Sequence, residues 1–280
     1  MLETGNVKLG RRAVKAGTVG LVLVAVAGLA GAQERAGWRL VWADEFDQPG
    51  LADPKKWTYE TGFVRNKEAQ YYTRARSENA RVENGALVIE GRKEEYKGPD
   101  GKEAHYTAAS LTTEGLFETT YGRVEVRARL PRGRGMWPAI WMLGTSIKTL
   151  GWPKCGEIDI MEFVGHEPDK VFATVHWFGA EKGKHTSLGG NLPGQKPSDG
   201  FHVYAVEWFA DRMDFYYDET KFFTYPVEKA GAADKNPFHK PHYLLINLAV
   251  GGSWGGQKGI DDSVFPQRYE VDYVRFYKSN

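Results

Sequence analysis

"GEIDIMEFVG", residues 156–165, places three carboxylates within six positions, on Glu157, Asp159 and Glu162. A helix would spread these side chains around its axis, because each helical residue turns by about 100°. On a regular strand Glu157 and Asp159 share one face, whereas Glu162 falls on the other. One extra residue near Met161, a β-bulge, would return Glu162 to the face of the other two acids. The segment therefore predicts a bulged β-strand with an acidic face.

The rest of the chain also carries strand patterns. "GRVEVRARLP", residues 122–131, alternates apolar and charged side chains, which is typical of a half-buried strand. "FHVYAVEWF", "MDFYYDETKFFTY" and "YEVDYVRFY" are rich in aromatic and β-branched residues, and Asn84–Gly85 suits a tight turn. Beyond the first 32 residues no stretch shows a sustained helical stripe. Many short strands in about 250 residues predict a two-sheet sandwich or a barrel.

The first 32 residues resemble an export signal. A basic start is followed by an apolar run over residues 18–29 and by the small residues Ala30, Gly31 and Ala32. The run is shorter than the ~20 residues that span a bilayer, so we expect no stable membrane insertion. We expect a signal peptide over 1–32, one domain over 33–280, and secretion or delivery to the periplasm. The pair Arg11–Arg12 leaves twin-arginine export open.

The net charge limits the classes of binding partner, and the cysteine content excludes an internal disulfide. The chain has a net charge of +1, and its leader holds four basic residues and one acid, so the remainder is close to neutral. A neutral domain offers no electrostatic basis for binding nucleic acid or an anionic membrane. Cys155 is the only cysteine, so there is no internal disulfide, and we expect a buried structural thiol.

The acids of the predicted strand suit cleavage of a glycosidic bond. With the bulge, the carboxyls of Glu157 and Glu162 can approach to about 5–5.5 Å, the separation in retaining glycosidases, where one acid attacks and the other protonates. Asp159 between them would raise the pKa of a neighbour or orient the nucleophile. The alternatives are a solvated strand face and a calcium or magnesium site. Ile158 and Ile160 favour an internal strand that lines a cleft, with both isoleucines facing the core.

Tryptophans indicate what such a cleft would hold. The chain has nine, and several lie in segments that read as loops. Indole faces pack against the C–H faces of sugar rings. Trp254, with glycines on both sides, has little local packing and is the best lone candidate for a sugar platform, followed by Trp137 and Trp141. Four others are expected to pack in the core: Trp38, Trp42, Trp57 and Trp208.

Taken in order, these segments resemble the family 16 glycoside hydrolases, in their laminarinase-type (endo-β-1,3-glucanase) branch. The resemblance covers essentially all of 33–280 and is carried by "WADEF", "EAQYYT", "VENGALVIEGRKE", "YGRVEVRARLPRGRGMWPAIWMLG", "GEIDIMEFVG", "ATVHWFG", "FHVYAVEWFADRMDFYYD", "LLINLAVGGSWGG" and "YEVDYVRFY". It implies an all-β jelly-roll sandwich of two antiparallel sheets, of the concanavalin A-like lectin/glucanase type, with a concave substrate groove. It also implies double displacement with retention of anomeric configuration.

The resemblance implies roles for single residues. Glu157 would be the nucleophile, Asp159 its assisting carboxylate and Glu162 the general acid/base. Trp137 and Trp141 would flank the sugar at the cleavage point. The other substrate-binding residues would be Asn66, Glu68, Gln70, His176, Asn247 and Trp254, with His176 near the acids.

One position departs from the family pattern. Many laminarinases carry an arginine in a segment like "YTSARLTT", whereas this chain reads "YTAASLTT", with Ser110 at that position. A serine removes a charged donor, so hydroxyl recognition near the cleavage point must differ. We expect β-1,3-glucan as the polysaccharide substrate and mixed-linkage β-1,3-1,4-glucan as a companion, with a galactan such as agar as the alternative.

The resemblance implies no cofactor for catalysis but a structural calcium. Glu45, Asp272 and the carbonyl of Gly85 would hold the ion on the convex side, and ordinary surface carboxylates are the alternative reading. A monomeric hydrolase is the main expectation. A non-catalytic glucan-binding protein on the same fold is the alternative from another class, and the three retained acids argue against it. Transglycosylation would use the same acids and stays open.

Overall fold

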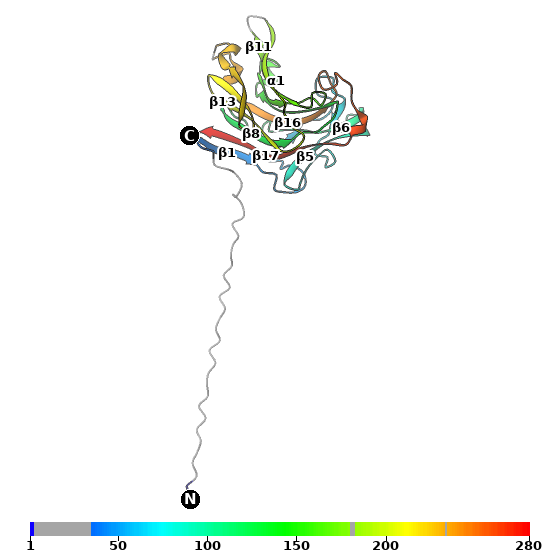
Figure 1. Ribbon diagram of the computed structural model, residues 1–280, viewed down its shortest axis with the longest axis vertical. Coiled ribbons are helices and arrows are strands. Elements are labelled where there is room, and N and C mark those ends of the chain that lie inside the picture. The colour runs from blue at the N-terminus through cyan, green and yellow to red at the C-terminus, as the bar shows by residue number, and fades with distance from the viewer. Residues whose placement is uncertain (3–34, 180–182, 233) are drawn as a thin grey trace. The chain divides into compact units, whose positions relative to one another are not determined.

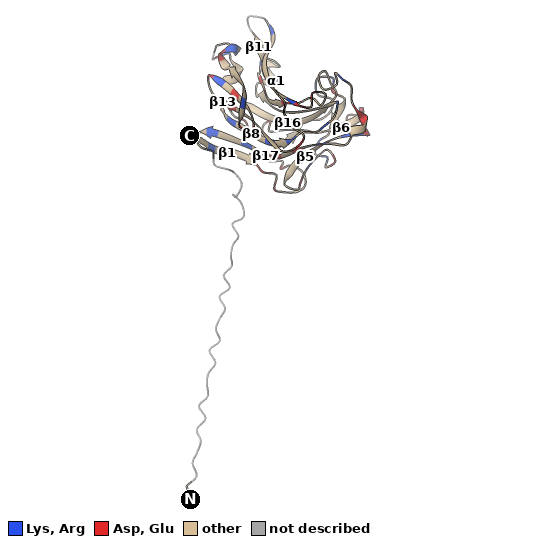
Figure 2. Cartoon of the chain, viewed as in Figure 1, with Lys and Arg blue, Asp and Glu red and all other residues tan. Residues whose placement is uncertain are grey.

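Two stacked β-sheets form the protein (Figure 1). The computed structural model describes residues 1–2, 35–179, 183–232 and 234–280, so the predicted signal peptide lies outside the described residues apart from its first two. Within those ranges no helix is long and apolar enough to cross a membrane. Residues 33–280 form one compact unit. Basic and acidic segments are scattered over its strands (Figure 2), in keeping with the near-neutral charge.

The described strands divide into a larger and a smaller sheet. The larger runs β15 (Thr220–Pro226), β14 (Arg212–Tyr217), β13 (His202–Trp208), β8 (Gly122–Arg129), β17 (Gln267–Ser279), β5 (Ala86–Lys97), β6 (Glu103–Ala108), β3 (Gln70–Tyr72), with β1 (Trp38–Asp44) on β17 and β4 (Ala80–Glu83) on β5. The smaller runs β12 (Lys184–Pro193), β11 (Lys170–Gly179), β10 (Glu157–Glu162), β9 (Met136–Gly144), β16 (His242–Val250), β7 (Ser110–Thr112), β2 (Thr58–Tyr59). Short helical turns are α1 (Ile147–Leu150), η1 (Val227–Ala230), η2 (Pro237–His239) and η3 (Asp262–Val264).

The strand patterns left a sandwich and a barrel open, and the structure confirms the two-sheet sandwich that the family resemblance implied. Neighbouring strands pair antiparallel throughout, except β3 and β6, which run parallel. Apolar side chains of both sheets meet in one core, where Val126 of β8 and Ile158 of β10 belong to the same cluster. Trp57 and Trp208 are buried in that core as expected. Trp42 is half-buried against Trp57 and the neighbouring rings of the same core.

Trp38 lies at the edge of the larger sheet rather than within the core. It starts β1 and is only partly buried, with Phe209 as its aromatic neighbour at 6.0 Å between ring centroids. Its position follows from the register, since Trp38 pairs with Ser279 at the end of β17. The expectation of full core packing is therefore wrong for this one tryptophan.

The bulge predicted in β10 is present. Between Asp159 and Met161 the strand advances two residues while β9 advances one, from Trp141 to Ile140. The register against β11 shifts in the same interval, before Glu162. This extra residue restores Glu162 to the face that carries Asp159.

The bulge also lets consecutive apolar side chains enter the core. Ile158, Ile160 and Met161 are all at most 1% exposed and belong to the main hydrophobic cluster. A regular strand could not bury both Ile160 and Met161 on one side, because adjacent side chains alternate. The core therefore holds the irregular register in place.

A close backbone approach fixes where β10 begins. The N–H of Gly144, at the end of β9, donates to the carbonyl of Gly156 at 3.1 Å. A Cβ on Gly144 would lie 1.9 Å from the carbonyl oxygen of Cys155. Cys155 itself is buried, as expected, and burial together with Glu157 raises the pKa of its thiol to about 11. Only glycine fits at position 144 without moving the entry to the acidic strand.

We expect Gly144→Ala to lower the free energy of unfolding by about 2–3 kcal/mol, because the new methyl group has no room. For a domain of this size, that is roughly 4–12 °C in Tm, measurable by calorimetry. Gly200→Ala is the matched control, since a Cβ there would meet nothing within 4 Å. Equal Tm values for the two variants would contradict the tight approach.

Candidate functional site

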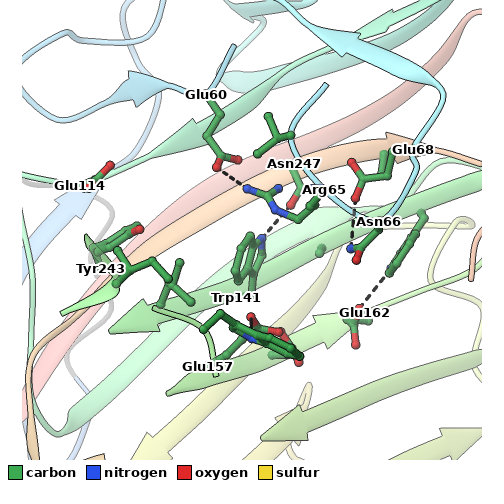
Figure 3. Close-up of a pocket in the computed structure, with 18 of the residues that line it drawn as sticks. Glu60, Arg65, Asn66, Glu68, Glu114, Trp141, Glu157, Glu162, Tyr243 and Asn247 are labelled. Carbon is green, nitrogen blue, oxygen red and sulfur yellow. Dashed lines mark hydrogen bonds and ion pairs between the residues drawn. The ribbon is translucent and has the colours of Figure 1, made fainter. Parts of the chain in front are cut away.

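A cleft of about 590 Å³ opens over the smaller sheet, where β9, β10 and β16 lie side by side (Figure 3). Its wall includes all three acids of β10. The other lining residues used below are Glu60, Arg65, Asn66, Glu68, Trp137, Trp141, Trp152 and Asn247. Strands thus supply the acids and the tryptophans Trp137 and Trp141, whereas Arg65 and Trp152 come from connecting segments.

Burial controls the protonation of the three acids. Burial, with the charge of Asp159 as the second cause, raises the pKa of Glu157 to about 8. Burial likewise raises the pKa of Asp159 to about 8, and it raises the pKa of Glu162 well above the ordinary range. The raised pKa values therefore favour bound protons on this strand at neutral pH. A carboxylic acid kept protonated at neutral pH can act as a general acid.

An indole N–H contacts each glutamate. Trp137 Nε1 donates to Glu162 Oε1 at 3.1 Å, and Trp152 Nε1 donates to Glu157 Oε2 at 3.0 Å. These bonds lower the pKa of both carboxyls and so oppose the effect of burial. Trp152 was missed from the sequence. Its place five residues before Glu157 was the only signal.

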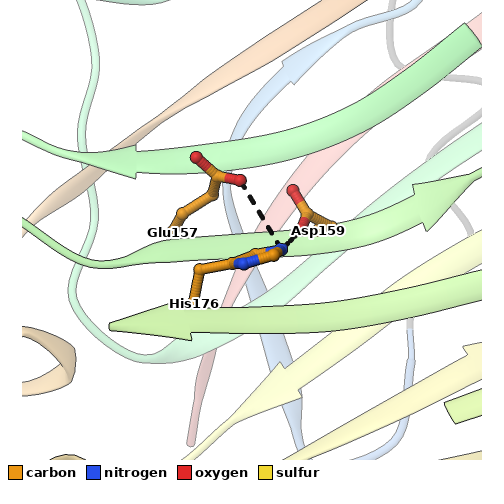
Figure 4. Close-up of side chains that lie close together, drawn as sticks. All are labelled: Glu157, Asp159 and His176. Atoms are coloured by element: carbon orange, nitrogen blue, oxygen red, sulfur yellow. Dashed lines mark ion pairs between the residues drawn. The ribbon is translucent and has the colours of Figure 1, made fainter. Parts of the chain in front are cut away.

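His176 lies beside the acids, as the family resemblance implied (Figure 4). It pairs with Glu157 across β10 and β11, and its Nε2 lies 3.0 Å from Asp159 Oδ2 and 3.8 Å from Glu157 Oε1. Two carboxyls and an imidazole in this arrangement could also attract a cation. Metal ligands must be deprotonated, however, and burial raises the pKa of both carboxyls, which opposes the ionisation of the pair at neutral pH. The cluster is better suited to proton transfer than to holding an ion.

A hydrogen-bonded chain runs beneath the cleft floor. Trp141 Nε1 donates to Asn247 Oδ1 at 2.8 Å, and Asn247 Nδ2 donates to the Tyr72 hydroxyl at 2.9 Å. The Tyr72 hydroxyl donates to Glu68 Oε2 at 3.1 Å. Asn66 Nδ2 contacts the other oxygen of Glu68 at 3.3 Å. Three residues predicted for the groove, Asn66, Glu68 and Asn247, therefore do line the cleft and are mutually oriented.

Gln70 was predicted to line the groove, and the structure corrects this. Its side chain is fully buried, because β3 is covered on both faces. It donates to Glu68 Oε2 at 2.7 Å and accepts from the backbone N–H of Val250 at 2.7 Å. Gln70 thus supports Glu68 from below and has no surface to offer a sugar.

Trp254 has more packing than its flanking glycines suggested. It is partly buried and meets Trp137 at 5.7 Å and Phe172 at 4.9 Å between ring centroids, edge to face in both pairs. It does not line the cleft described above. The premise that Trp254 has little to pack against is wrong, and its contact with a sugar stays a prediction.

An arginine reaches the cleft from an unexpected place (Figure 3). Ser110 is buried and its hydroxyl donates to Glu60 Oε2 at 2.6 Å. Glu60 pairs with Arg65, and the guanidinium of Arg65 lies 4.8 Å from the ring centroid of Trp141. The serine that replaces a family arginine thus anchors an ion pair that carries a different arginine. The sequence offered only the position of Arg65 next to Asn66 as a hint.

The residues expected to hold calcium are arranged differently. Glu45 forms a two-pronged ion pair with Arg275, at 2.8 Å on both of its oxygens, and Asp272 pairs with Arg127. Gly85 lies in the turn between β4 and β5. A cation would have to displace two guanidinium groups, so these side chains do not fit calcium as they stand. Calcium binding by Glu45, Gly85 and Asp272 stays a prediction.

Comparison with known proteins identifies relatives of this arrangement. The family model "Glycosyl hydrolases family 16" matches residues 67–275. A beta-glucanase of Rhodothermus marinus is 48% identical over 250 residues, which cover 86% of this chain and 85% of that protein. The solved structure of the laminarinase from Rhodothermus marinus matches with a TM-score of 0.79 at 46% identity, covering 87% of this chain and 98% of that one. A non-specific endo-beta-1,3(4)-glucanase named SCLam matches with a TM-score of 0.81 at 44% identity, covering 88% and 93%.

The raised pKa of Glu157 predicts that Glu157→Gln increases the free energy of unfolding, and that the increase depends on pH. The ordinary value is 4.5 and the folded value is about 8, so between these limits the folded protein keeps a proton that the unfolded chain releases. The free energy of unfolding therefore falls as the pH rises through this window. Near pH 8, we expect the glutamine variant to be more stable than the parent by at least roughly 1 kcal/mol, since one pKa unit is about 1.36 kcal/mol.

Urea unfolding near pH 8 and below about pH 4.5 measures this difference, which should vanish at the lower pH. Glu95→Gln is the matched control, because it makes the same change on a side chain that is 83% exposed. A gain of equal size at both pH values would show that ionisation is not its cause.

Proposed function

Because the chain belongs to the glycosyl hydrolases of family 16, we propose that it cleaves β-1,3-glucan within the chain, and mixed-linkage β-1,3-1,4-glucan as well. The observation that carries this proposal is the acidic face of β10, where the buried Asp159 and the half-buried Glu157 and Glu162 share one cleft. A protein that only binds glucan would gain nothing from protons held on that strand. The names of the relatives support the choice of glucan.

The first step would form a covalent intermediate. Glu157 attacks the anomeric carbon, Glu162 gives its proton to the glycosidic oxygen, and the bond between that carbon and oxygen breaks. Burial keeps Glu162 protonated for this purpose. Glu157 must be ionised, and Asp159 makes this easier when the proton shared by the pair rests on the more deeply buried Asp159. The N–H of Trp152 stabilises the Glu157 anion.

The second step would release the sugar. Glu162, now ionised, takes a proton from water, the water oxygen attacks the anomeric carbon, and the bond to Glu157 breaks. Two inversions at one carbon retain its configuration. A sugar hydroxyl in place of water would give transglycosylation with the same groups. The predicted leader over 1–32 supports action outside the cytoplasm, and we propose a monomer.

Replacement of the proposed nucleophile tests the chemistry. Purified protein should release reducing ends from laminarin, and Glu157→Ala should abolish this while laminarin binding persists. Glu162→Gln should lower kcat by about 10²–10⁴-fold, the usual contribution of a general acid. Circular dichroism checks that both variants fold. An active Glu157→Ala protein would disprove the assigned role.

Product analysis tests linkage and mode of attack. We expect laminarin and lichenan to yield mixed oligosaccharides early in the reaction, as internal cleavage requires, and agarose to stay intact. Proton NMR of the first products should show the β-anomer, because double displacement retains configuration. Cleavage of agarose in preference to laminarin would instead favour the galactan alternative.

A further inference from the structure

Two histidines lie in contact next to the acids. His176 of β11 and His185 of β12 are cross-strand neighbours, and His176 Nδ1 lies 2.8 Å from His185 Nε2. Their rings are stacked, with centroids 5.1 Å apart and an angle of 17° between the planes. On its other side, His176 Nε2 lies 3.0 Å from Asp159 Oδ2 (Figure 4), a close approach without the angle of a hydrogen bond, so that oxygen has no hydrogen-bond partner among the described residues. Asp159, His176 and His185 thus form a line from the cleft toward solvent.

The chemistry of imidazole sets the direction of the bond between the rings. Asp159 Oδ2 can only accept when the carboxyl is ionised or when its proton lies on Oδ1, and the contact is then attractive if His176 carries a proton on Nε2. In the neutral ring Nδ1 is then bare and must accept, which makes His185 Nε2 the donor. Which nitrogen of a histidine holds the proton is decided by the bond at its other nitrogen. His185 is the group that decides it for His176.

His185 also touches the partner of the other catalytic carboxyl. Its ring lies 4.5 Å from the ring of Trp152, centroid to centroid. Trp152 is 49% exposed, and its Nε1 donates to Glu157 Oε2 at 3.0 Å. One side chain of β12 therefore supports both the imidazole beside Asp159 and the indole beside Glu157.

We propose that His185 is a positioning residue for glycoside cleavage: it donates to His176 so that the His176 Nε2 proton faces Asp159, and its ring holds Trp152 against Glu157. This inference rests on the function proposed above. His185 touches no reacting atom and acts through its two neighbours. The Nε2 of His185 contacts His176 and its ring contacts Trp152, so substitutions can remove one contact and keep the other.

The charged groups around His176 and His185 determine how loss of the hydrogen bond between the two rings would change the pH dependence of activity. Glu157, Asp159 and Glu162 of β10 all interact with His176, and His185 faces it from β12. The charge of His176 lowers the pKa of both glutamates. With its proton on Nδ1 instead, the neutral His176 would turn a bare nitrogen toward Asp159 and would stabilise the carboxylates less. The acidic limb of the pH profile should then move to higher pH.

His185→Phe removes the nitrogen and keeps a ring against Trp152. We expect kcat on laminarin to fall about 5- to 20-fold, the range that one hydrogen bond supplies, with KM within about two-fold of the parent value. The acidic limb of the kcat/KM profile should move up. His185→Gln keeps an N–H donor and should restore much of kcat. His105→Phe is the matched control, because His105 is 73% exposed and pairs with Glu95.

Histidine ¹⁵N NMR tests the inference even if the protein does not cleave laminarin. In the parent and in His185→Gln, His176 should be protonated on Nε2, whereas in His185→Phe it should exchange between tautomers. An unchanged His176 tautomer in His185→Phe, or a kcat equal to that of the parent, would overturn the proposal. A parent without activity on any glucan would refute the proposed function alone. Equal Tm values for parent and variants exclude misfolding as the cause.

Discussion

The site depends on one extra residue in one strand. A pleated strand sends alternate side chains to opposite faces, and three acids at the spacing of β10 cannot share a face under that rule. The bulge at Ile160 and Met161 breaks the alternation once, and it persists because both side chains are buried in the core. Hydrophobic packing behind the sheet therefore determines where Glu162 lies in front of it. In this strand the packing of Ile160 and Met161 in the core also fixes the positions of the catalytic acids.

Burial has an electrostatic consequence as well. Burial of Asp159 and partial burial of Glu157 in the cleft raise the pKa of each carboxyl to about 8. Carboxyls that resist ionisation destabilise the folded chain at neutral and alkaline pH. Two indole N–H groups and His176 offset part of that effect, each from a different segment. The same dry environment supplies a protonated acid for the chemistry.

The faces on which the side chains of β10 lie could be predicted from the sequence, because side chains alternate along a strand. The spacing of the acids was enough to place the bulge near Met161. Alternation was enough to predict an all-β sandwich or barrel, and the family resemblance was needed to choose the sandwich. The alternation of side chains does not predict contacts between segments that are distant in the sequence. Trp254 looked free because its neighbours are glycines, yet Phe172 packs against it. Gln70 looked accessible, but both faces of β3 are covered.

The remaining contacts missed from the sequence come from side chains outside the motif. Glu45 and Asp272 were expected to share an ion, but each meets an arginine that is far away in the sequence. Trp152 lies before β10, and His185 lies on the strand two positions across the sheet. Neither residue was part of the alternating apolar and polar pattern from which strands are predicted. Only the folded arrangement shows that they surround the acids.

Arg65 has a consequence for how such a protein can diversify. Its guanidinium covers the face of Trp141, yet it stands on the connection between β2 and β3, outside the sheet that carries the acids. Insertions and substitutions in connections are tolerated far better than changes in a packed strand. One part of the cleft lining, the guanidinium of Arg65, is therefore encoded apart from the strand that carries the acids. New polysaccharide preferences can arise by exchanging a loop, while the bulged strand and its chemistry are inherited intact.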